Sequence, residues 1–375
     1  MLFTVTYNNG GIMSSIWGSN LKISLFGESH GQVVGGTLHN FPAGVPLNLD
    51  RIKLALKLRQ GGNNFTQARK EEERPKILSG ITNGVTNGAP ITVVFANKDY
   101  NVTEFIDGIL RPSQADYAVD SRYNNAADHN GGGHRSGRVT APLVFLGTMC
   151  ADYLSTAGIE VVSHIKCIGD IYDERFDADI PELLIERLNS SPLATISPEA
   201  RKRMVSLLMG IKATGDSIGG SVESAVVGMP AGFGSPIFDN MESKIASILF
   251  SIPAVKGVGF GLGHMFAHAR GSTVNDCFVS GPDGEVKTSS NNNGGLNGGM
   301  SNGMPILVTT DFKPTPSISQ PQKTLDFIKN RIVDISIKGA HVPCLVPRAN
   351  IVVTSAIAVA VLDTYLEGVG YRHIL

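Results

Sequence analysis

The chain has 375 residues, enough for one large domain or two smaller ones, and its formal net charge of −1 gives no support for nucleic acid or an anionic membrane as the main partner. Hydrophobic residues make up 42% of the sequence and charged residues 17%, which together predict a soluble globular protein with a sizeable core. The four cysteines lie far apart and form no CxxC pair. This spacing argues against a disulfide scaffold, favours reduced thiols in a cytoplasmic protein, and leaves no metal site expected.

The N-terminal residues lack the charged-then-apolar pattern of a signal peptide, and a second possible start follows at Met13. We expect residues 1–12 to be a disordered N-terminal extension and residues 13–375 to form a single domain. The sequence contains no run of 18 consecutive apolar residues, so no transmembrane helix is expected.

Strands are predicted where apolar and polar residues alternate, over residues 21–26, 32–38, 91–96, 159–168 and 219–228. Helices are predicted from amphipathic runs and from capping residues, which are Asp50, Ser197 ahead of Pro198, and Gly158. Two of the helices start after Asp50 and after Ser197. The others cover about residues 141–157, 239–250, 321–332 and 350–365. The last of them is apolar, too short to span a bilayer and therefore expected to be buried. Strands and helices mix without a regular alternation, which favours an α+β fold.

Two glycine-rich segments could carry chemistry. The segment FGESHG at residues 26–31 presents His30, Ser29 and Glu28 on a turn after a predicted strand. The histidine is either satisfied within that turn or poised to act on a ligand. The segment HNGGGHRSGR at residues 129–138 opens a predicted helix, so its backbone N–H groups and arginines could hold an anion. A glycine-rich surface turn is the alternative interpretation of this segment.

Later segments add cations and hydroxyls. The segment KPTPS at residues 313–317 supplies an ammonium group and two hydroxyls, and GAHVPCLVPRA at residues 339–349 places His341 and Arg348 ahead of the apolar helix. Each alone also fits a rigid turn. Residues 281–305, rich in glycine and asparagine, form either a flexible loop or an anion cradle. These residue types indicate an anion site beside one histidine, which suits a phosphate-bearing cofactor or substrate.

Taken together, the motifs resemble the chorismate synthase family over nearly the whole chain from Met13 on. The matching stretches, in order, are SSIWGSNLKISLFGESHG, GGGHRSGRVTAPLVFLG, GDSIGG, MPAGFGSPIFD, SIPAVKGV, NGGMSNGMPI, FKPTPSIS and PCLVPRA. The resemblance implies a chorismate synthase-like β-α-β sandwich, with antiparallel sheets flanked by helices, and a homotetramer.

The same resemblance implies a lyase of the shikimate pathway, which serves aromatic amino acid biosynthesis. Its substrate would be a small phosphorylated carboxylate, 5-enolpyruvylshikimate-3-phosphate, which loses phosphate and a proton to give chorismate. The implied cofactor is reduced FMN, which lends an electron and takes it back, so that no net redox change occurs. No nucleic acid or membrane partner is implied.

The resemblance also assigns roles to residues. His30 matches a family histidine that is expected to donate a proton beside the flavin. Substrate binding is expected from Ser29, Arg59 and Arg138. The flavin site is expected to contain His134, Arg135, Ser136, Ala254, Gly298, Lys313, Thr315 and Ser317.

Several positions depart from the family pattern. Gln114 stands where the family has its second histidine, and a glutamine cannot act as an acid near neutral pH. Val342 replaces an aspartate thought to help the flavin accept the substrate proton, and Ala340 replaces an arginine. The other departures replace charged family residues and lie at Leu58, Asn64, Asn130, Thr309 and Thr354.

Three interpretations therefore stay open at the level of the sequence. The chain is a working, divergent chorismate synthase, or an FMN-binding homologue with another substrate, or a non-catalytic structural or regulatory family member. The first requires turnover of the shikimate-pathway substrate. The second requires bound flavin without that turnover, and the third requires neither.

Overall fold

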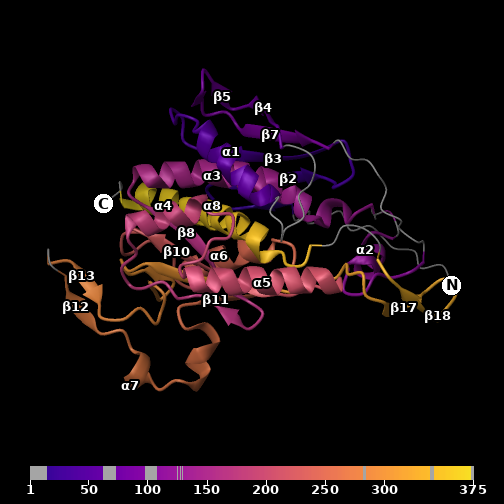
Figure 1. Ribbon diagram of the computed structural model, residues 1–375. Helices are drawn as coiled ribbons and strands as arrows, with labels where there is room; N and C mark the ends of the chain where they lie inside the picture. Colours follow the sequence, from indigo (N-terminus) through magenta and orange to yellow (C-terminus); the bar gives the residue numbers. More distant parts are fainter. Residues whose placement is uncertain are drawn as a thin grey trace.

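Two antiparallel sheets lie on either side of a layer of helices (Figure 1). The structure, a computed structural model, describes residues 15–61, 73–97, 108–124, 126, 128, 130–281, 284–337 and 342–372. The α+β sandwich predicted from the sequence is confirmed, with the main helices enclosed between the sheets. The expected extension of residues 1–12 lies outside the described residues, and the single domain from residue 13 on stays a prediction.

The first sheet has the strand order β1-β2-β3-β7-β4. Its strands are β1 (Ile16–Trp17), β2 (Lys22–Gly27), β3 (Val33–His39), β7 (Ile91–Ala96) and β4 (Pro75–Ser79). In β7 the alternate residues Ile91, Val93 and Phe95 are buried, because successive side chains point to opposite faces of a sheet. The strand predictions for residues 21–26, 32–38 and 91–96 are confirmed.

The second sheet has the strand order β11-β16-β10-β8-β9. Its strands are β11 (Val255–Phe260), β16 (Ile306–Phe312), β10 (Gly220–Val227), β8 (Glu160–Ile168) and β9 (Ile171–Tyr172). The predicted strands at residues 159–168 and 219–228 are β8 and β10, which pair with each other. Most neighbouring strands of the second sheet are therefore distant in sequence, whereas β1, β2 and β3 of the first sheet follow one another along the chain.

The helical layer is built on α3 (Thr140–Thr156) and α8 (Val346–Arg372), which pack against each other. Helix α3 lies on β3 and β7, and α8 lies on β8 and β10, so the two helices join the two sheets. Helices α1 (Leu49–Gln60) and α6 (Met241–Phe250) flank this pair. Gly147 permits the close approach of α3 and α8, since a Cβ there would lie 2.4 Å from the Ser355 carbonyl oxygen.

The remaining described elements are short hairpins and helices of varied length. They are the hairpins β5 (Ile81–Thr82) with β6 (Val85–Thr86), β12 (Phe278–Ser280) with β13 (Val286–Thr288), β14 (Leu296–Asn297) with β15 (Met300–Ser301) and β17 (Gln322–Asp326) with β18 (Arg331–Ile335), and the helices α2 (Asp116–Tyr123), α4 (Glu182–Ser190), α5 (Pro198–Thr214) and α7 (Gly271–Val274). The segment with α7, β12 and β13 projects from the body of the molecule (Figure 1).

Helix caps agree with the sequence in one case and differ in another. The Ser197 hydroxyl accepts the Ala200 N–H at 3.4 Å and caps α5, as predicted. Helix α1 begins two residues earlier than expected and is capped by Asn48, whose Oδ1 accepts the Arg51 N–H at 3.1 Å. The prediction of Asp50 as the cap was wrong, because Asp50 lies within the first turn.

The predicted helix over residues 321–332 was wrong. The segment forms the hairpin β17–β18, in which Thr324 pairs with Val333 and Leu325 with Ile332. Asn330 turns the chain with a φ of 46°, a conformation that asparagine tolerates better than most residues. The β-branched residues of β18 favour a strand, and this preference outweighed the amphipathic pattern.

Helix α8 is longer than the expected 350–365. It alone among the described helices is long and apolar enough to cross a membrane, and 83% of the relevant segment is buried inside the protein. Its burial is as predicted, and its estimated length was wrong. A helix enclosed in this way between two sheets is the central core element of this fold.

Candidate functional site

A cleft of about 680 Å³ opens where the edge of the first sheet meets the edge of the second. Its walls come from β1 and β2, from residues 134–140, from the end of α6 with the residues that follow it, and from Lys313. A volume of this size lies within the range of about 300–1,000 Å³ that is typical of small-molecule sites.

Cationic side chains converge on this cleft. Arg135, Lys256 and Lys313 line it together with His134, and no aspartate or glutamate is among the described residues of its lining. A concave site lined by one sign of charge concentrates ligands of the opposite sign. The cleft therefore suits an anionic ligand.

The loop before α3 shapes one wall. Gly131, Gly132 and Gly133 all have positive φ values, of 60°, 117° and 55°, which glycine adopts at little cost. Two short 3-10 turns follow, and between them the Ser136 hydroxyl accepts the Arg138 N–H at 3.2 Å. The predicted anion loop at residues 129–138 thus leads directly into the N-terminus of α3.

His134 fixes this loop to the first sheet. Its Nδ1 lies 2.8 Å from the Gly27 carbonyl oxygen at the end of β2, and its Nε2 lies 3.2 Å from the Ser15 hydroxyl. Both ring nitrogens are engaged, so His134 acts as a positioning residue for the cleft wall. It does not offer a free nitrogen for proton transfer.

Ala254 holds the opposite wall in a strained conformation. Its φ of 75° is unusual for a residue with a side chain, and its carbonyl oxygen accepts the Lys313 N–H at 3.0 Å. Strained backbone of this kind costs roughly 1–3 kcal/mol and concentrates at functional sites. The contact also fixes the start of the KPTPS segment beside the cleft.

His30 lies behind the same glycine loop. Its Nδ1 lies 3.0 Å from the Ser29 hydroxyl and 3.2 Å from the Asn130 carbonyl oxygen, which also accepts the Ser29 hydroxyl at 3.1 Å. Since a carbonyl oxygen can only accept, the geometry favours a proton on Nδ1. Among the described residues, no hydrogen bond engages the other ring nitrogen, Nε2, which therefore remains available for a ligand.

Arg138 supports the turn that carries His30. It is 6% exposed, and its Nε donates to Asn97 Oδ1 at 2.9 Å. The Asn97 amide nitrogen donates to the carbonyl oxygens of Glu28 and Gly31 at 3.0 and 2.8 Å. Arg138 therefore orients the two peptide groups on either side of His30.

Arg59 and Arg138 share one buried carboxylate. Glu73 forms an ion pair with Arg59 and accepts from Arg138 Nη1 at 3.1 Å, and each of the three side chains is 4% exposed. Arg59 also borders a smaller cavity of about 140 Å³, which shares Thr140, Ile252 and Pro253 with the cleft. The two arginines form a rigid cationic base next to the cleft.

The KPTPS segment meets the segment that contains Gln114. Lys313 Nζ donates to the Ser113 carbonyl oxygen at 2.7 Å, and Gln114 Nε2 donates to the Ser317 hydroxyl at 3.0 Å. The Thr315 hydroxyl is buried and has no hydrogen-bond partner among the described residues. A buried hydroxyl without a partner is costly and points to a ligand or water that the site accommodates.

The chain matches known proteins over most of its length. Residues 21–366 match the sequence model of the family described as chorismate synthase. This chain belongs to the chorismate synthase family. It is 41% identical over 367 residues to the chorismate synthase of Methanobrevibacter smithii, covering 96% of this chain and 98% of the relative. It is also 41% identical over 353 residues to that of Thermococcus kodakarensis, covering 93% and 97%.

A solved structure agrees with this family membership. It is a crystal structure of chorismate synthase that superposes with a TM-score of 0.75 at 29% sequence identity, covering 94% of each chain. The chorismate synthase fold expected from the sequence motifs is therefore confirmed.

The fold brings together most of the residues that the chorismate synthase motifs indicated. His134, Arg135, Ser136, Ala254 and Lys313 line one cleft. Gln114, Thr315 and Ser317 lie in the segments that adjoin Lys313, and His30 with Ser29 lies on the other side of the glycine loop. Their roles as chorismate synthase site residues stay predictions.

Five of the expected site residues line the cleft, and Gly298 and Val342 are among those that do not. Gly298 is in the β14–β15 turn. The carbonyl oxygen of the next residue, Gly299, accepts the Met241 N–H at 3.0 Å, so this turn lies at the N-terminal end of α6. The cleft lies at the C-terminal end of α6. Val342 precedes Pro343, whose carbonyl oxygen accepts the Ile218 N–H at 2.8 Å before β10. Three residues named from the chorismate synthase motifs, Asn64, Ala340 and His341, lie outside the described residues.

The asparagine-rich stretch at residues 281–305 uses its donors internally. The Asp276 carboxylate accepts the N–H groups of Asn292 and Asn293, each at 2.8 Å, and the Ser290 hydroxyl at 2.6 Å. Burial opposes the charge of Asp276, but these hydrogen bonds outweigh it and lower its pKa. A carboxylate of the protein itself therefore occupies these donors of the stretch.

Sequence reasoning missed Glu73, Asn97 and Lys256. Lys256 lies within the matching stretch SIPAVKGV, two residues after Ala254, so that chorismate synthase motif carried a signal for it. Glu73 belongs to a run of three glutamates, and no local pattern distinguishes it from the other two.

Proposed function

We propose that this chain catalyses the formation of chorismate from 5-enolpyruvylshikimate-3-phosphate, by loss of phosphate and a proton. One observation carries the proposal: five of the residues indicated by the family motifs line one cation-rich cleft that contains no carboxylate among its described lining. A substrate with a phosphate and carboxylates matches that charge. Nothing in the described residues or in the relatives favours a different substrate or a non-catalytic role.

Reduced FMN is the proposed cofactor, and the residues fit it. The loop at residues 131–138 and Lys313 would hold the FMN phosphate, because helix N-termini and lysines bind phosphate groups. The buried Thr315 hydroxyl without a partner supports a ligand at this place. When bound, reduced FMN would supply an electron that assists the loss of phosphate and take it back afterwards.

His30 is the proposed proton donor. Its Nδ1 is oriented by the Ser29 hydroxyl and the Asn130 carbonyl oxygen, which leaves Nε2 to hold the proton that is donated. Ser29 would contribute to substrate binding from the same turn. The Arg59 and Arg138 pair, with Glu73 between them, would add positive potential behind the substrate and fix its orientation.

Gln114 is proposed to limit the rate. Gln114 takes the place of a family histidine beside the KPTPS segment, where its amide donates to Ser317. An amide can donate a hydrogen bond but cannot transfer a proton near neutral pH. A positioned general acid contributes roughly 10²–10⁴-fold to a rate, so turnover is expected to be low for this family.

Two further properties are proposed from family membership. We infer a homotetramer, supported by exposed apolar side chains such as Phe238 and Phe278, which are 88% and 70% exposed in the single chain. We also infer a cytoplasmic location. Light scattering tests the assembly, and a particle of a single chain's mass at micromolar concentration would contradict it.

An anaerobic assay tests the proposed function. Purified protein is mixed with reduced FMN and 5-enolpyruvylshikimate-3-phosphate, and chorismate is followed by its absorbance. The expected result is slow formation of chorismate that requires both compounds. Saturable binding of FMN without any chorismate would show that the substrate is a different one.

A further inference from the structure

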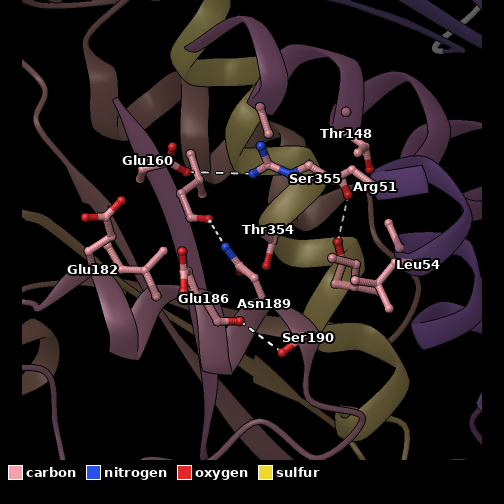
Figure 2. A pocket seen from close by; sticks show the side chains of 16 residues that line it. Arg51, Leu54, Thr148, Glu160, Glu182, Glu186, Asn189, Ser190, Thr354 and Ser355 are labelled. Atoms are coloured by element: carbon pink, nitrogen blue, oxygen red, sulfur yellow. Dashed lines mark hydrogen bonds and ion pairs between the residues drawn. The ribbon is translucent and has the colours of Figure 1, made fainter. Parts of the chain in front are cut away.

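A second cavity lies away from the cleft, between α1, α3, α4, β8 and α8, and its volume is about 340 Å³ (Figure 2). Leu54, Ala55, Ile185 and Ile351 give it apolar walls. Helix α3 separates the two sites, since Leu143 lines the cleft and Thr148 and Ala151, further along the helix, line this cavity. Nothing in the proposed reaction uses this second cavity.

The charges around this cavity are mainly negative. Figure 2 shows Glu160, Glu182 and Glu186 on one side and Leu54 on the other. The only cation of its described lining is Arg51, whose Nη1 is 2.9 Å from Asp152 Oδ1 and whose Nη2 is 3.7 Å from Glu160. Asp152 offsets the charge of Arg51, so the carboxylates of the lining determine the local potential.

The hydroxyl groups of the lining can only accept hydrogen bonds from a ligand. Thr354 Oγ1 lies 2.8 Å from the Ser163 hydroxyl, and every one of these hydroxyls has a carbonyl oxygen four residues earlier in its own helix as an acceptor for its single hydrogen. These contacts are Thr148 to Val144 at 2.7 Å, Ser190 to Glu186 at 3.0 Å, Thr354 to Asn350 at 3.0 Å and Ser355 to Ile351 at 2.8 Å. A hydroxyl has only one hydrogen, so lone pairs alone remain for a ligand.

The amide of the lining is partly engaged. Asn189 Nδ2 donates one of its two N–H groups to the Val161 carbonyl oxygen at 3.5 Å. The cavity therefore offers many acceptors and negative charge, and most of its donors are engaged within the protein. A ligand that brings its own N–H donors and a positive charge fits this lining best.

The arrangement favours an organic cation over a metal ion. Among the described residues, no group of three or more His, Cys, Asp or Glu side chains could hold a metal ion. We propose that this cavity binds a small amine, with its ammonium group at the carboxylates of α4 and its apolar body on the wall formed by Leu54, Ile185 and Ile351.

Two matched probes test this proposal on the intact protein. Calorimetric titration near neutral pH compares 2-phenylethylamine with 2-phenylethanol, which has the same apolar body but no charge. The amine is expected to bind saturably and about tenfold or more tighter than the alcohol, because a hydrogen bond to a charged group is stronger than a neutral one. Equal affinities, or no saturable binding of the amine, would overturn the proposal.

A pair of variants locates the binding. The double variant Glu182→Gln, Glu186→Gln keeps the size of both side chains and removes their two charges. It should therefore lose the preference for the amine over the alcohol. The control Glu199→Gln changes an exposed glutamate of α5 that does not line the cavity. Thermal melting checks that all variants are folded. Unchanged amine affinity in the folded double variant would place the ligand elsewhere and refute the assignment.

Discussion

Gly131 lies against the imidazole ring of His30: a β-carbon at Gly131 would be 2.0 Å from His30 Cε1 and 2.4 Å from Nδ1. Real β-carbons do not come this close to other atoms, so only glycine leaves room for the ring. The neighbouring Asn130 carbonyl oxygen meets His30 Nδ1 at 3.2 Å. One backbone segment therefore both supports the ring and sets which nitrogen is free.

The variant Gly131→Ala should displace His30 and lower chorismate formation by about 10²-fold, since a shift of about 1 Å at a reacting group can have this effect. The matched control is Gly137→Ala, in the same loop, where an added β-carbon meets nothing within 4 Å. Steady-state turnover of both variants measures the difference. Equal activity in the two would mean that the position of His30 is unimportant.

Lys313→Met should weaken the binding of reduced FMN by about 1.5–3 kcal/mol, because it removes a charged partner of the proposed phosphate site. The methionine keeps the apolar stem of the lysine. Titration of FMN under anaerobic, reducing conditions gives the affinity. Lys202→Met, at an exposed position on α5, is the control and should bind FMN as the parent does. A similar affinity in both variants would place the phosphate away from Lys313.

Gln114→His should increase kcat by about 10²-fold, because it introduces an acid beside Ser317 where the amide now donates at 3.0 Å. Gln114→Leu, which has a similar size and no acidic group, should give no increase. Turnover at saturating substrate compares the two. If the histidine variant stays as slow as the parent, Gln114 does not face the reacting groups.

A buried charge cluster predicts how stability depends on pH. His164 is fully buried, with Nδ1 2.9 Å from Asp173 and Nε2 3.1 Å from Glu223. Burial opposes the charged ring, but the hydrogen bonds to both carboxylates outweigh it and raise the pKa of His164 above the ordinary value of a histidine. Burial likewise opposes the charges of Asp173 and Glu223, yet their hydrogen bonds lower the pKa of each.

The directions of these pKa shifts define the pH range in which the cluster stabilises the fold. A raised histidine pKa contributes stability that is complete below about pH 6.5 and is lost as the pH rises through the folded-state value. The lowered carboxylate pKa values contribute stability that is present above about pH 4.5 and is lost in acid. The cluster therefore stabilises the fold most between about pH 4.5 and pH 6.5.

His164→Gln should remove the alkaline part of this dependence. Above pH 6.5 the parent should lose at most about 1.4 kcal/mol of unfolding free energy per pH unit from this one proton, and the variant should lose less. Urea unfolding across the pH range gives both slopes. The exposed His268→Gln variant is the control and should keep the parent's slope. Identical slopes in His164→Gln and the parent would mean that His164 is neutral in the folded protein.

The fold and much of the cleft could be predicted because short, contiguous stretches of sequence indicate them. The glycine loop at residues 129–138 and the KPTPS segment are contiguous motifs, and the strands that support them alternate clearly. Glu73 could not be predicted in this way. Its place between Arg59 and Arg138 depends on the meeting of three distant segments, and a carboxylate in a run of charges has no local pattern that indicates burial.

Helix α8 illustrates the same limit. The apolar pattern weakens near Asp363, yet the helix continues to Arg372. Asp363 accepts the N–H groups of Asn20 and Leu21 at 2.7 and 2.8 Å, and Lys244 Nζ lies 3.0 Å from Asp363 and 2.7 Å from Glu367. These partners come from distant segments, so the sequence around Asp363 alone suggested an end to the helix.

The most direct test of the account measures chorismate formation by His30→Ala beside the parent protein, with reduced FMN present. His39→Ala, a histidine at the end of β3 that does not line the cleft, is the matched control. If His30 donates the proton, turnover should be slow in the parent and in the control and absent in His30→Ala, while all three proteins bind FMN alike. Full activity in His30→Ala would contradict this role, because the proton would then come from another group.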